Sequence, residues 1–411
     1  MRPTMDDVAA AASVSKSTVS RALSGDPRVK PETRRRILQI AAELGYTPDY
    51  SASALAHGQT WMIGVATPGV PRGFSDPFYL EFLGGLGDGA MRAGYNLLIA
   101  APSEREPQDA PSDEAAPSRA ARTRGVHLAG LIARRAVDAV VLTEPAENDP
   151  RLPLLRRYGL PFAFLGTCEE NGQVAEGVSF VDGDNIGGAR AAVEHLIALG
   201  HRRIACIAGA AGLVSTRHRL EGFRRAMAAA GLPVDERWIV DGESTRQGGR
   251  RAMRALIEMG LGRDEEAPTA VFACNDVMAI GAMVAAREAG LSVPGDVSIA
   301  GFDGIALSEL VDPPLTTVQQ PIYELGKTLA EVLLDVIEHS RKTRRRARKT
   351  AAAVPAEGPG RGRTQGHADG YVRREILPCR LVVRGTTAPP KGALEGGAAA
   401  GAGSLPRSAA L

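Results

Sequence analysis

The sequence predicts a small all-α domain at the amino terminus, followed by a larger α/β domain with two doubly wound lobes. Three observations lead to this prediction. The chain has 411 residues, which is too long for one ordinary core. Residues 1–46 contain three short helical periods, each with a helix-start signal. From residue 62 onward, apolar strand-like runs alternate with helical stretches, a pattern typical of parallel sheets covered on both faces.

The three helices of the amino-terminal domain follow from their end signals. Thr4 precedes the first helix, and Asp7 three residues later completes a capping box. Ser15 is positioned to cap the second helix, and Pro31 suits the first turn of the third. Gly45 supplies a stop after the third helix.

The second helix, within VSKSTVSRAL at residues 14–23, has two chemically different faces. Its apolar face consists of Val19, Ala22 and Leu23, and its polar face of Ser17, Ser20, Arg21 and Ser24. By itself this pattern fits equally an amphipathic helix of a small bundle and a helix that enters the major groove of DNA. The short turn AASVS before it has helix-turn-helix spacing, which favours the second interpretation.

The predicted strands of the large domain end in polar residues. These strands are MIGVAT (62–67), YNLLIA (95–100), AVVLT (139–143), FAFLG (162–166), VSFVD (178–182), RIACIAG (203–209), AVFACN (270–275) and VSIAGFD (297–303). Because parallel strands open a crevice at their carboxyl ends, residues just after them are candidate ligand contacts. The candidates are Phe78, Tyr79, Asp184, Asn185, Arg219, Asn275, Asp276 and Asp303. Two of these candidates have an alternative structural role: Asp303 could cap the turn that follows it, and the Asn275–Asp276 pair could cap the next helix.

Composition and motifs exclude several classes of protein. Four scattered cysteines without a CxxC pair argue against a zinc site or disulfide framework and fit a reducing cytoplasm. No secretory signal and no apolar run of about 18 residues occur, so no membrane partner is expected. GLGDGA at 85–90 lacks the strand–turn–helix context of a dinucleotide site. Since no G-x-S-x-G, HExxH or P-loop motif occurs, we expect no catalytic residues, no metal and no cofactor.

Three segments differ in composition from the rest of the chain. Residues 102–124 and 340–370 are predicted to be disordered insertions, and 391–411 a disordered tail. The second insertion begins with Arg341–Lys349, where seven of nine residues are Lys or Arg. This run is either a solvated insertion or a source of sequence-independent attraction to DNA.

Several stretches together resemble the LacI (lactose-repressor) family of bacterial transcriptional regulators. They include TVSRALSG, ELGYTP, CNDVMAIGAMVAAREAGLSVPGDVSIAGFDG and PPLTTVQQP. The resemblance implies a helix-turn-helix DNA-binding head at 1–47, a hinge at 48–60 and a two-lobed, periplasmic-binding-protein-like domain for effector binding and dimerisation at 61–390. It further implies a cytoplasmic homodimer, most simply a repressor, that binds a pseudopalindromic double-stranded DNA operator under control of a small effector such as a sugar.

The resemblance also implies roles for individual residues. Lys16, Ser17 and Arg21 match positions that contact bases, and Leu55 matches the hinge leucine that enters the minor groove. Positions that contact phosphates are matched by Thr4, Ser15, Thr18, Ser20, Ser24, Thr33 and Tyr46. Effector-contacting positions are matched by Phe78, Tyr79, Arg219, Asn275 and Asp303.

The chain departs from the family pattern at four positions. Asp49 stands where an asparagine is usual, Ser53 replaces a hinge arginine, and Ser13 replaces the turn glycine. The first two predict weaker hinge binding to phosphates. Ser244 stands where many members have an aromatic residue, which weakens the expectation of a sugar ligand. Two other classes of protein are alternatives. The DNA-binding head argues against a solute-binding transport protein, and the missing nucleophile–base motif argues against an enzyme.

Overall fold

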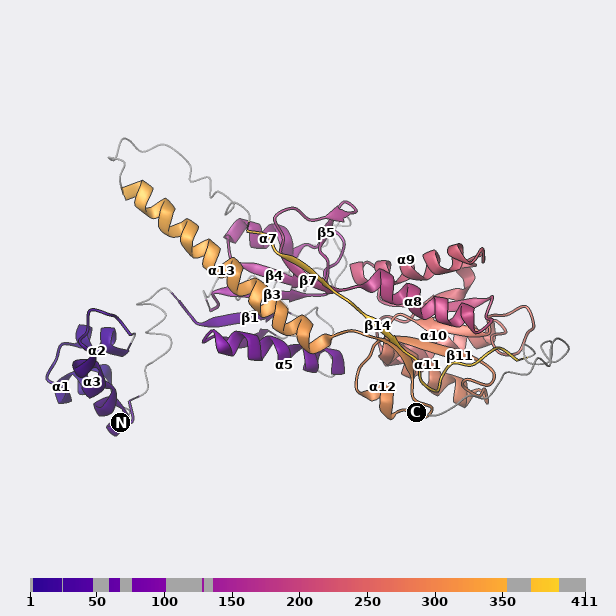
Figure 1. Ribbon diagram of the computed structural model, residues 1–411, viewed down its shortest axis with the longest axis horizontal. Helices are drawn as coiled ribbons and strands as arrows, with labels where there is room; N and C mark the ends of the chain where they lie inside the picture. The colour runs from indigo at the N-terminus through magenta and orange to yellow at the C-terminus, as the bar shows by residue number, and fades with distance from the viewer. Residues whose placement is uncertain are drawn as a thin grey trace, which may run out of the picture. The chain divides into compact units, whose positions relative to one another are not determined.

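The chain folds into two compact units, Met1–Trp61 and Met62–Leu411 (Figure 1). The computed structural model describes residues 3–23, 25–46, 59–66, 76–100, 128, 136–352 and 371–391. Most of the predicted hinge at 48–60, all of the insertion at 102–124 and residues 392–411 lie outside this described part.

The first unit contains the three predicted helices, α1 (Met5–Ala11), α2 (Lys16–Leu23) and α3 (Pro31–Glu43). The capping box is confirmed, because the Thr4 hydroxyl accepts a hydrogen bond from the Asp7 amide while the Asp7 carboxylate accepts one from the Thr4 amide. Val8, Val19 and Ile37, one from each helix, are fully buried and form the centre of a small apolar core. The apolar face predicted for α2 therefore attaches that helix to the other two.

The second unit contains two six-stranded sheets. The first sheet has the order β13-β7-β4-β3-β1-β2, with all strands parallel. Its strands are β1 (Met62–Ala66), β2 (Asn96–Ala100), β3 (Ala139–Thr143), β4 (Phe162–Leu165), β7 (Phe180–Gly183) and β13 (Arg374–Leu377). Its helices are α5 (Pro77–Arg92), α7 (Arg151–Tyr158) and α13 (Ile322–Ala352). A two-stranded hairpin, β5 (Glu169–Glu170) and β6 (Gln173–Val174), follows β4.

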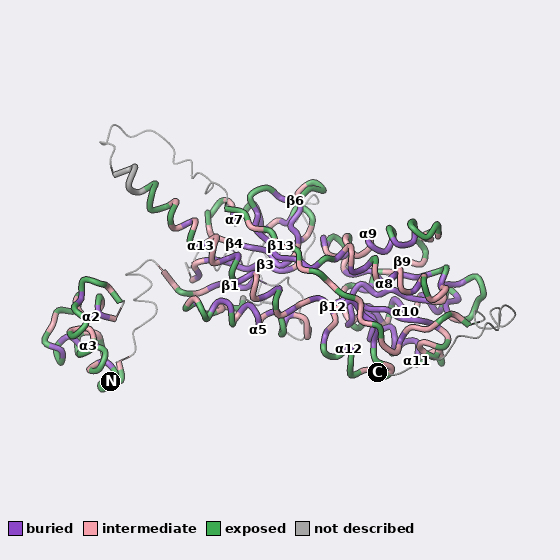
Figure 2. Tube along the Cα trace, in the orientation of Figure 1, coloured by how far each residue is buried: buried purple, intermediate pink, exposed green. Residues whose placement is uncertain are grey.

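The second sheet has the order β14-β12-β11-β10-β8-β9, and its edge strand β14 runs antiparallel to β12. Its strands are β8 (Ile204–Ala208), β9 (Ile239–Asp241), β10 (Ala270–Ala273), β11 (Ser298–Asp303), β12 (Thr316–Gln319) and β14 (Arg380–Val382). Its helices are α8 (Asn185–Ala198), α9 (Val214–Ala229), α10 (Arg246–Glu258), α11 (Asp276–Glu288) and α12 (Leu307–Leu310), with a 3₁₀ turn at Glu236–Trp238. The central strands are buried throughout (Figure 2), as a parallel sheet covered on both faces requires. The prediction of two doubly wound lobes is confirmed.

The glycine-rich stretch at 85–90 lies within α5 and packs against α13. A Cβ atom on Gly85 would lie 1.9 Å from the Tyr323 carbonyl oxygen, and one on Gly89 would lie 2.5 Å from the Ala330 Cβ. Because these glycines let two helix backbones approach closely, they explain the motif as a packing face, in agreement with the sequence-based interpretation.

The prediction of disorder from residue 340 is wrong for its first part, because α13 continues to Ala352. The segment is rich in Arg, Lys and Ala, which favour helix. Lys342 pairs with Glu338 one turn earlier at 2.6 Å, and Arg341 donates to the Tyr95 hydroxyl at 2.7 Å. Residues 353–370 lie outside the described part.

Candidate functional sites

The outer face of α2 carries the three residues predicted to contact bases. Lys16, Ser17 and Arg21 are exposed, while Val19 and Ala22 on the same helix are buried. Lys16 donates to the Asp6 carboxylate at 2.8 Å, with both side chains more than half exposed. An exposed ion pair of this kind contributes little stability, so Lys16 can exchange Asp6 for another acceptor.

The start of α2 is ordered by its own hydroxyl groups. The Ser15 hydroxyl accepts a hydrogen bond from the Thr18 amide at 3.2 Å and lies 2.8 Å from each of the Ser17 and Thr18 hydroxyls. This arrangement presents a cluster of hydroxyls at the amino end of a helix, where the backbone dipole favours an anion.

The remaining residues predicted to contact phosphates are distributed over the head. Ser20 and Thr33 are partly exposed, and Tyr46 packs its ring against the head core. Thr4 is held in the capping box described above. Ser24 and Leu55, together with Asp49 and Ser53, lie outside the described residues.

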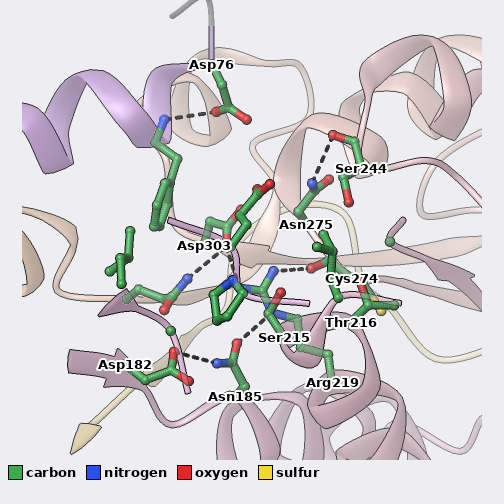
Figure 3. Close-up of a pocket in the computed structure, with 18 of the residues that line it drawn as sticks. Asp76, Asp182, Asn185, Ser215, Thr216, Arg219, Ser244, Cys274, Asn275 and Asp303 are labelled. Carbon is green, nitrogen blue, oxygen red and sulfur yellow. Dashed lines mark hydrogen bonds and ion pairs between the residues drawn. The ribbon is translucent and has the colours of Figure 1, made fainter. Parts of the chain in front are cut away.

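In the second unit, a pocket lies between the two sheets and is lined by residues from both lobes (Figure 3). The first lobe contributes Asp76, Phe78, Tyr79, Glu144, Pro145, Leu165, Gly166 and Asp182. The second lobe and the crossing segments contribute Asn185, Gly209, Leu213, Ser215, Thr216, Arg219, Ser244, Cys274, Asn275, Asp303, Gln320 and Leu325. The carboxyl ends of parallel strands thus face the pocket, as the doubly wound topology predicts.

Arg219, from α9, is the centre of the polar network in this pocket. Its guanidinium donates to the Asn185 side-chain oxygen at 2.8 Å and to the Cys274 carbonyl oxygen at 2.5 Å. It also pairs with the Asp303 carboxylate at 3.1 Å. The guanidinium carbon lies 3.9 Å from the centre of the Phe302 ring, a cation–π contact. Arg219 is therefore held rigidly, with its orientation set before any ligand arrives.

Asp303 ends β11 in an uncommon backbone conformation, with φ of 116°. Such strain is found mainly where the surrounding structure compensates for it, often at binding sites. Here Gln320 provides two such contacts: its side-chain amide donates to the Asp303 carboxylate at 2.9 Å, and its backbone amide donates to the Asp303 carbonyl at 3.0 Å.

Burial changes the acidity of the pocket carboxylates. It raises the pKa of Asp303 to about 7, although Arg219 acts in the opposite direction. The pKa of Asp182 is also raised by burial, against the hydrogen bonds that its carboxylate accepts from the Thr167 amide at 2.9 Å and hydroxyl at 2.8 Å. Burial likewise raises the pKa of Asp76, whose carboxylate caps α5 by accepting from the Phe78 amide.

Comparison with known proteins agrees with this geometry. Residues 4–49 match the family model described as bacterial regulatory proteins, lacI family, and residues 193–355 match a periplasmic binding protein-like domain. The transcriptional regulator CelR of Thermobifida fusca is 35% identical over 82% of this chain and 92% of its own length. The transcriptional repressor CytR of Escherichia coli K12 is 35% identical over 82% of this chain and 90% of its own length.

The chain belongs to the LacI family of bacterial regulatory proteins.

Solved structures place this LacI-family protein among effector-controlled DNA-binding regulators. A CelR–cellobiose complex has a TM-score of 0.62 at 31% identity, covering 94% of this chain and 100% of CelR. A lac repressor dimer bound to operator and the anti-inducer ONPF has a TM-score of 0.71 at 26% identity, with the same two coverages. The protein is accordingly a DNA-binding transcriptional regulator. A search of its described helices finds none with the length and apolar character needed to cross a membrane.

Six of the eight residues that the sequence of this LacI-family regulator offers as candidate ligand contacts line the pocket. They are Phe78, Tyr79, Asn185, Arg219, Asn275 and Asp303. Asp184 does not line it: this residue is exposed, and its carboxylate caps α8 by accepting from the Gly187 amide at 2.8 Å. The carboxylate that reaches the pocket from this strand is Asp182, two residues earlier, because β7 ends at Gly183 and Asp184 already belongs to the cap of α8.

Asn275 caps a helix and also lines the pocket. Its side-chain oxygen caps α11 by accepting from the Met278 amide at 2.8 Å, and its side-chain nitrogen donates to the Ser244 carbonyl at 3.4 Å in the pocket wall. Asp276 is fully buried and accepts from the Gly304 and Ile305 amides. Asp276 therefore holds the turn after β11 and does not contribute to the pocket lining.

Sequence reasoning missed several lining residues of the regulator. Asp76 could have been found from its position before Pro77, a helix-start signal. Glu144 directly follows β3 and has the same strand-end signal that identified Asp303. Gln320 follows β12 in the same way. Thr216 and Ser215 lie in the first turn of α9 and carry no sequence signal that separates them from ordinary helix residues.

Proposed function

We propose that this regulator is a homodimeric repressor of the bacterial cytoplasm, and that a small molecule in the pocket between its lobes controls its affinity for a pseudopalindromic operator. The observation that carries the proposal is the Arg219–Asp303–Asn185 network, preorganised in a pocket that both lobes line. A ligand there contacts both lobes at once, so it stabilises one arrangement of the lobes over another.

The lining chemistry limits the class of effector. Four of the described lining residues are carboxylic acids, Asp76, Glu144, Asp182 and Asp303, whereas Arg219 is the one lysine or arginine among them. We therefore expect a ligand rich in hydrogen-bond donors and without negative charge, such as a sugar, a nucleoside or a related metabolite. Ser244 provides no ring on which a sugar could stack, so among the described lining residues the aromatic rings are those of Phe78 and Tyr79. We assign the pocket to binding and not to catalysis, because the relatives CelR and CytR are transcriptional regulators.

Contacts that join the two lobes support coupling between the lobe arrangement and ligand binding. Glu169, in the hairpin of the first lobe, lies 2.9 Å from the His218 ring nitrogen and also pairs with Arg217, both on α9 of the second lobe. Backbone hydrogen bonds from Glu147 to Gly212 and from Val214 to Pro145 lie beside this cluster, each 3.1 Å long. These contacts can break and re-form with other partners when a ligand changes the orientation of one lobe relative to the other.

The DNA-binding part of the proposal is tested by selecting duplexes from a random pool with the full-length protein. We expect a two-fold symmetric sequence, because a symmetric dimer presents two heads. The Arg21→Ala variant should reduce discrimination against mismatched bases by about 1–3 kcal/mol, and the Arg35→Ala variant, an exposed arginine on α3, is the matched control. Failure to recover any enriched sequence would contradict this part of the proposal.

The effector part is tested by thermal denaturation with a panel of neutral sugars, nucleosides, amines and their phosphorylated counterparts. A ligand that binds only the folded protein raises its melting temperature. We expect stabilisation by an uncharged or cationic compound, its loss in the Asp303→Asn variant, and a change in operator affinity on addition of the same compound. Selective stabilisation by phosphorylated compounds would refute the proposed effector class.

A further inference from the structure

The last three turns of α13 extend beyond the core of the first lobe. Ser340 is buried, and residues 341–347, the part of the helix beyond it whose exposure is described, are partly or fully exposed. The remaining helix from 341 to 352 is about 18 Å long at 1.5 Å per residue. Its sequence, RKTRRRARKTAA, contains no large apolar residue, so it offers nothing to bury against the apolar surface of a protein partner.

The extension is anchored at the end of the lobe where the head's linker enters. Arg341 donates to the Tyr95 hydroxyl at 2.7 Å and to the Asp138 carboxylate at 3.3 Å. The Asp138 amide in turn donates to the carbonyl of Met62, the first residue of β1. Tyr95 and Asp138 directly precede β2 and β3, so this is the amino end of the parallel sheet, opposite the effector pocket. Figure 1 shows α13 running along the sheet to this end.

Other basic side chains of the extension are exposed. Arg344 donates to the Gly159 carbonyl at 2.5 Å and, with Arg341, joins the helix to the lobe. Lys342, Arg345 and Arg346 are exposed on the rest of the surface. The pair of Lys342 with Glu338 is exposed on both sides and contributes little, so Lys342 can accept a stronger anionic partner.

We propose that this basic extension of α13, residues 341–349, is a second DNA-contacting surface that binds phosphates of the duplex held by the head, without reading sequence. Two observations carry it: a run with seven cations in nine residues lies on α13, where Lys342 and Arg345 are exposed, and this part of the helix is anchored beside Met62, the first residue of the unit that follows the head and its linker. The connection from Tyr46 to Met62 spans 16 residues and reaches at most roughly 55 Å, so its length allows DNA held by the head to meet this end of the lobe. Cations gain affinity for DNA by releasing condensed counterions.

The test is the salt dependence of DNA binding by the full-length Lys342→Gln/Arg345→Gln/Arg346→Gln variant. Binding is measured by fluorescence anisotropy on a long duplex that contains the selected operator and on a scrambled duplex of equal length. Each lost phosphate contact reduces the slope of log K against log salt by about 0.9. If the variant loses three contacts, the ratio of wild-type to variant affinity for DNA should fall about 40-fold between about 50 and 200 mM salt. The ratio of operator to scrambled affinity should stay unchanged, since phosphate contacts carry no sequence information.

A matched control separates local contacts from net charge. The Arg225→Gln/Arg237→Gln/Arg251→Gln variant also removes three exposed cations, all on the second lobe, and should keep the wild-type slope. Equal slopes for the wild type and the α13 variant would overturn the proposal. An unchanged slope on DNA combined with lost binding to RNA or to anionic vesicles would overturn it as well. Loss of operator preference in the Arg21→Ala variant with the salt slope retained would show that head and extension act separately.

Discussion

The Asp303→Asn substitution removes a buried carboxylate from the pocket wall and tests how its burial affects stability. The pKa of Asp303 rises from 3.8 to about 7 in the folded protein, because burial disfavours the charged form more than Arg219 favours it. A rise of about three units corresponds to about 4 kcal/mol of differential interaction between the two protonation states. The folded state thus holds this proton more tightly than the unfolded state does.

The sign of the pH dependence follows from this proton affinity. The stabilisation from protonated Asp303 is complete below about pH 4 and is lost as the pH rises through about 7. Between about pH 5 and 8, the free energy of unfolding of the wild type should therefore fall by about 3 kcal/mol relative to that of the Asp303→Asn variant. The asparagine keeps an oxygen that can accept from Arg219, so the variant is expected to fold.

Urea denaturation of the full chain, followed by the fluorescence of Trp238 in the second lobe, measures this difference. The Asp184→Asn variant is the matched control, because Asp184 is the exposed cap of α8 and does not line the pocket. Parallel stability curves for the wild type and Asp303→Asn between pH 5 and 8 would refute the assignment of Asp303 as a buried acid with a raised pKa.

Two further predictions concern packing and coupling. The Gly89→Ala variant should lose about 1–3 kcal/mol of stability in denaturant titration, since its Cβ would lie 2.5 Å from that of Ala330. The Gly87→Ala variant on the same helix is the control, because its new Cβ would lie 3.8 Å from its nearest neighbour. Its free energy of unfolding should rise by up to about 1 kcal/mol. Equal effects of the two substitutions would contradict the close packing of α5 on α13. The Glu169→Gln substitution weakens the contacts between the β5–β6 hairpin and α9. X-ray scattering of the variant without ligand should therefore report a larger radius of gyration than that of the wild type. An unchanged radius would argue against a role for Glu169 in holding the two lobes together.

Much of the pocket was predictable because its residues follow a rule of chain topology. Asn275 and Asp303 stand at or just after strand ends, and parallel strands bring their carboxyl ends to one side of the sheet. Arg219 lies in the second turn of α9, the helix that follows β8. Asp184, a candidate from the sequence, does not line the pocket, and the reason is local. Strand β7 ends at Gly183, so Asp182 still obeys the alternation of the strand while Asp184 already belongs to the cap of α8.

Local signals in the sequence by themselves determined the helices of the head, the alternation of strands and helices, and the candidate side chains at strand ends. Capping residues, apolar periods and the location of prolines act over a few residues, and they can therefore be read along the chain. Only the tertiary structure decided that Arg219 joins Asn185 and Asp303 in one network, since these contacts link residues separated by tens of positions. It also decided that Arg341 and its neighbours form a helix anchored beside Met62, because Tyr95, Asp138 and Gly159, distant in sequence, supply the acceptors that hold it there.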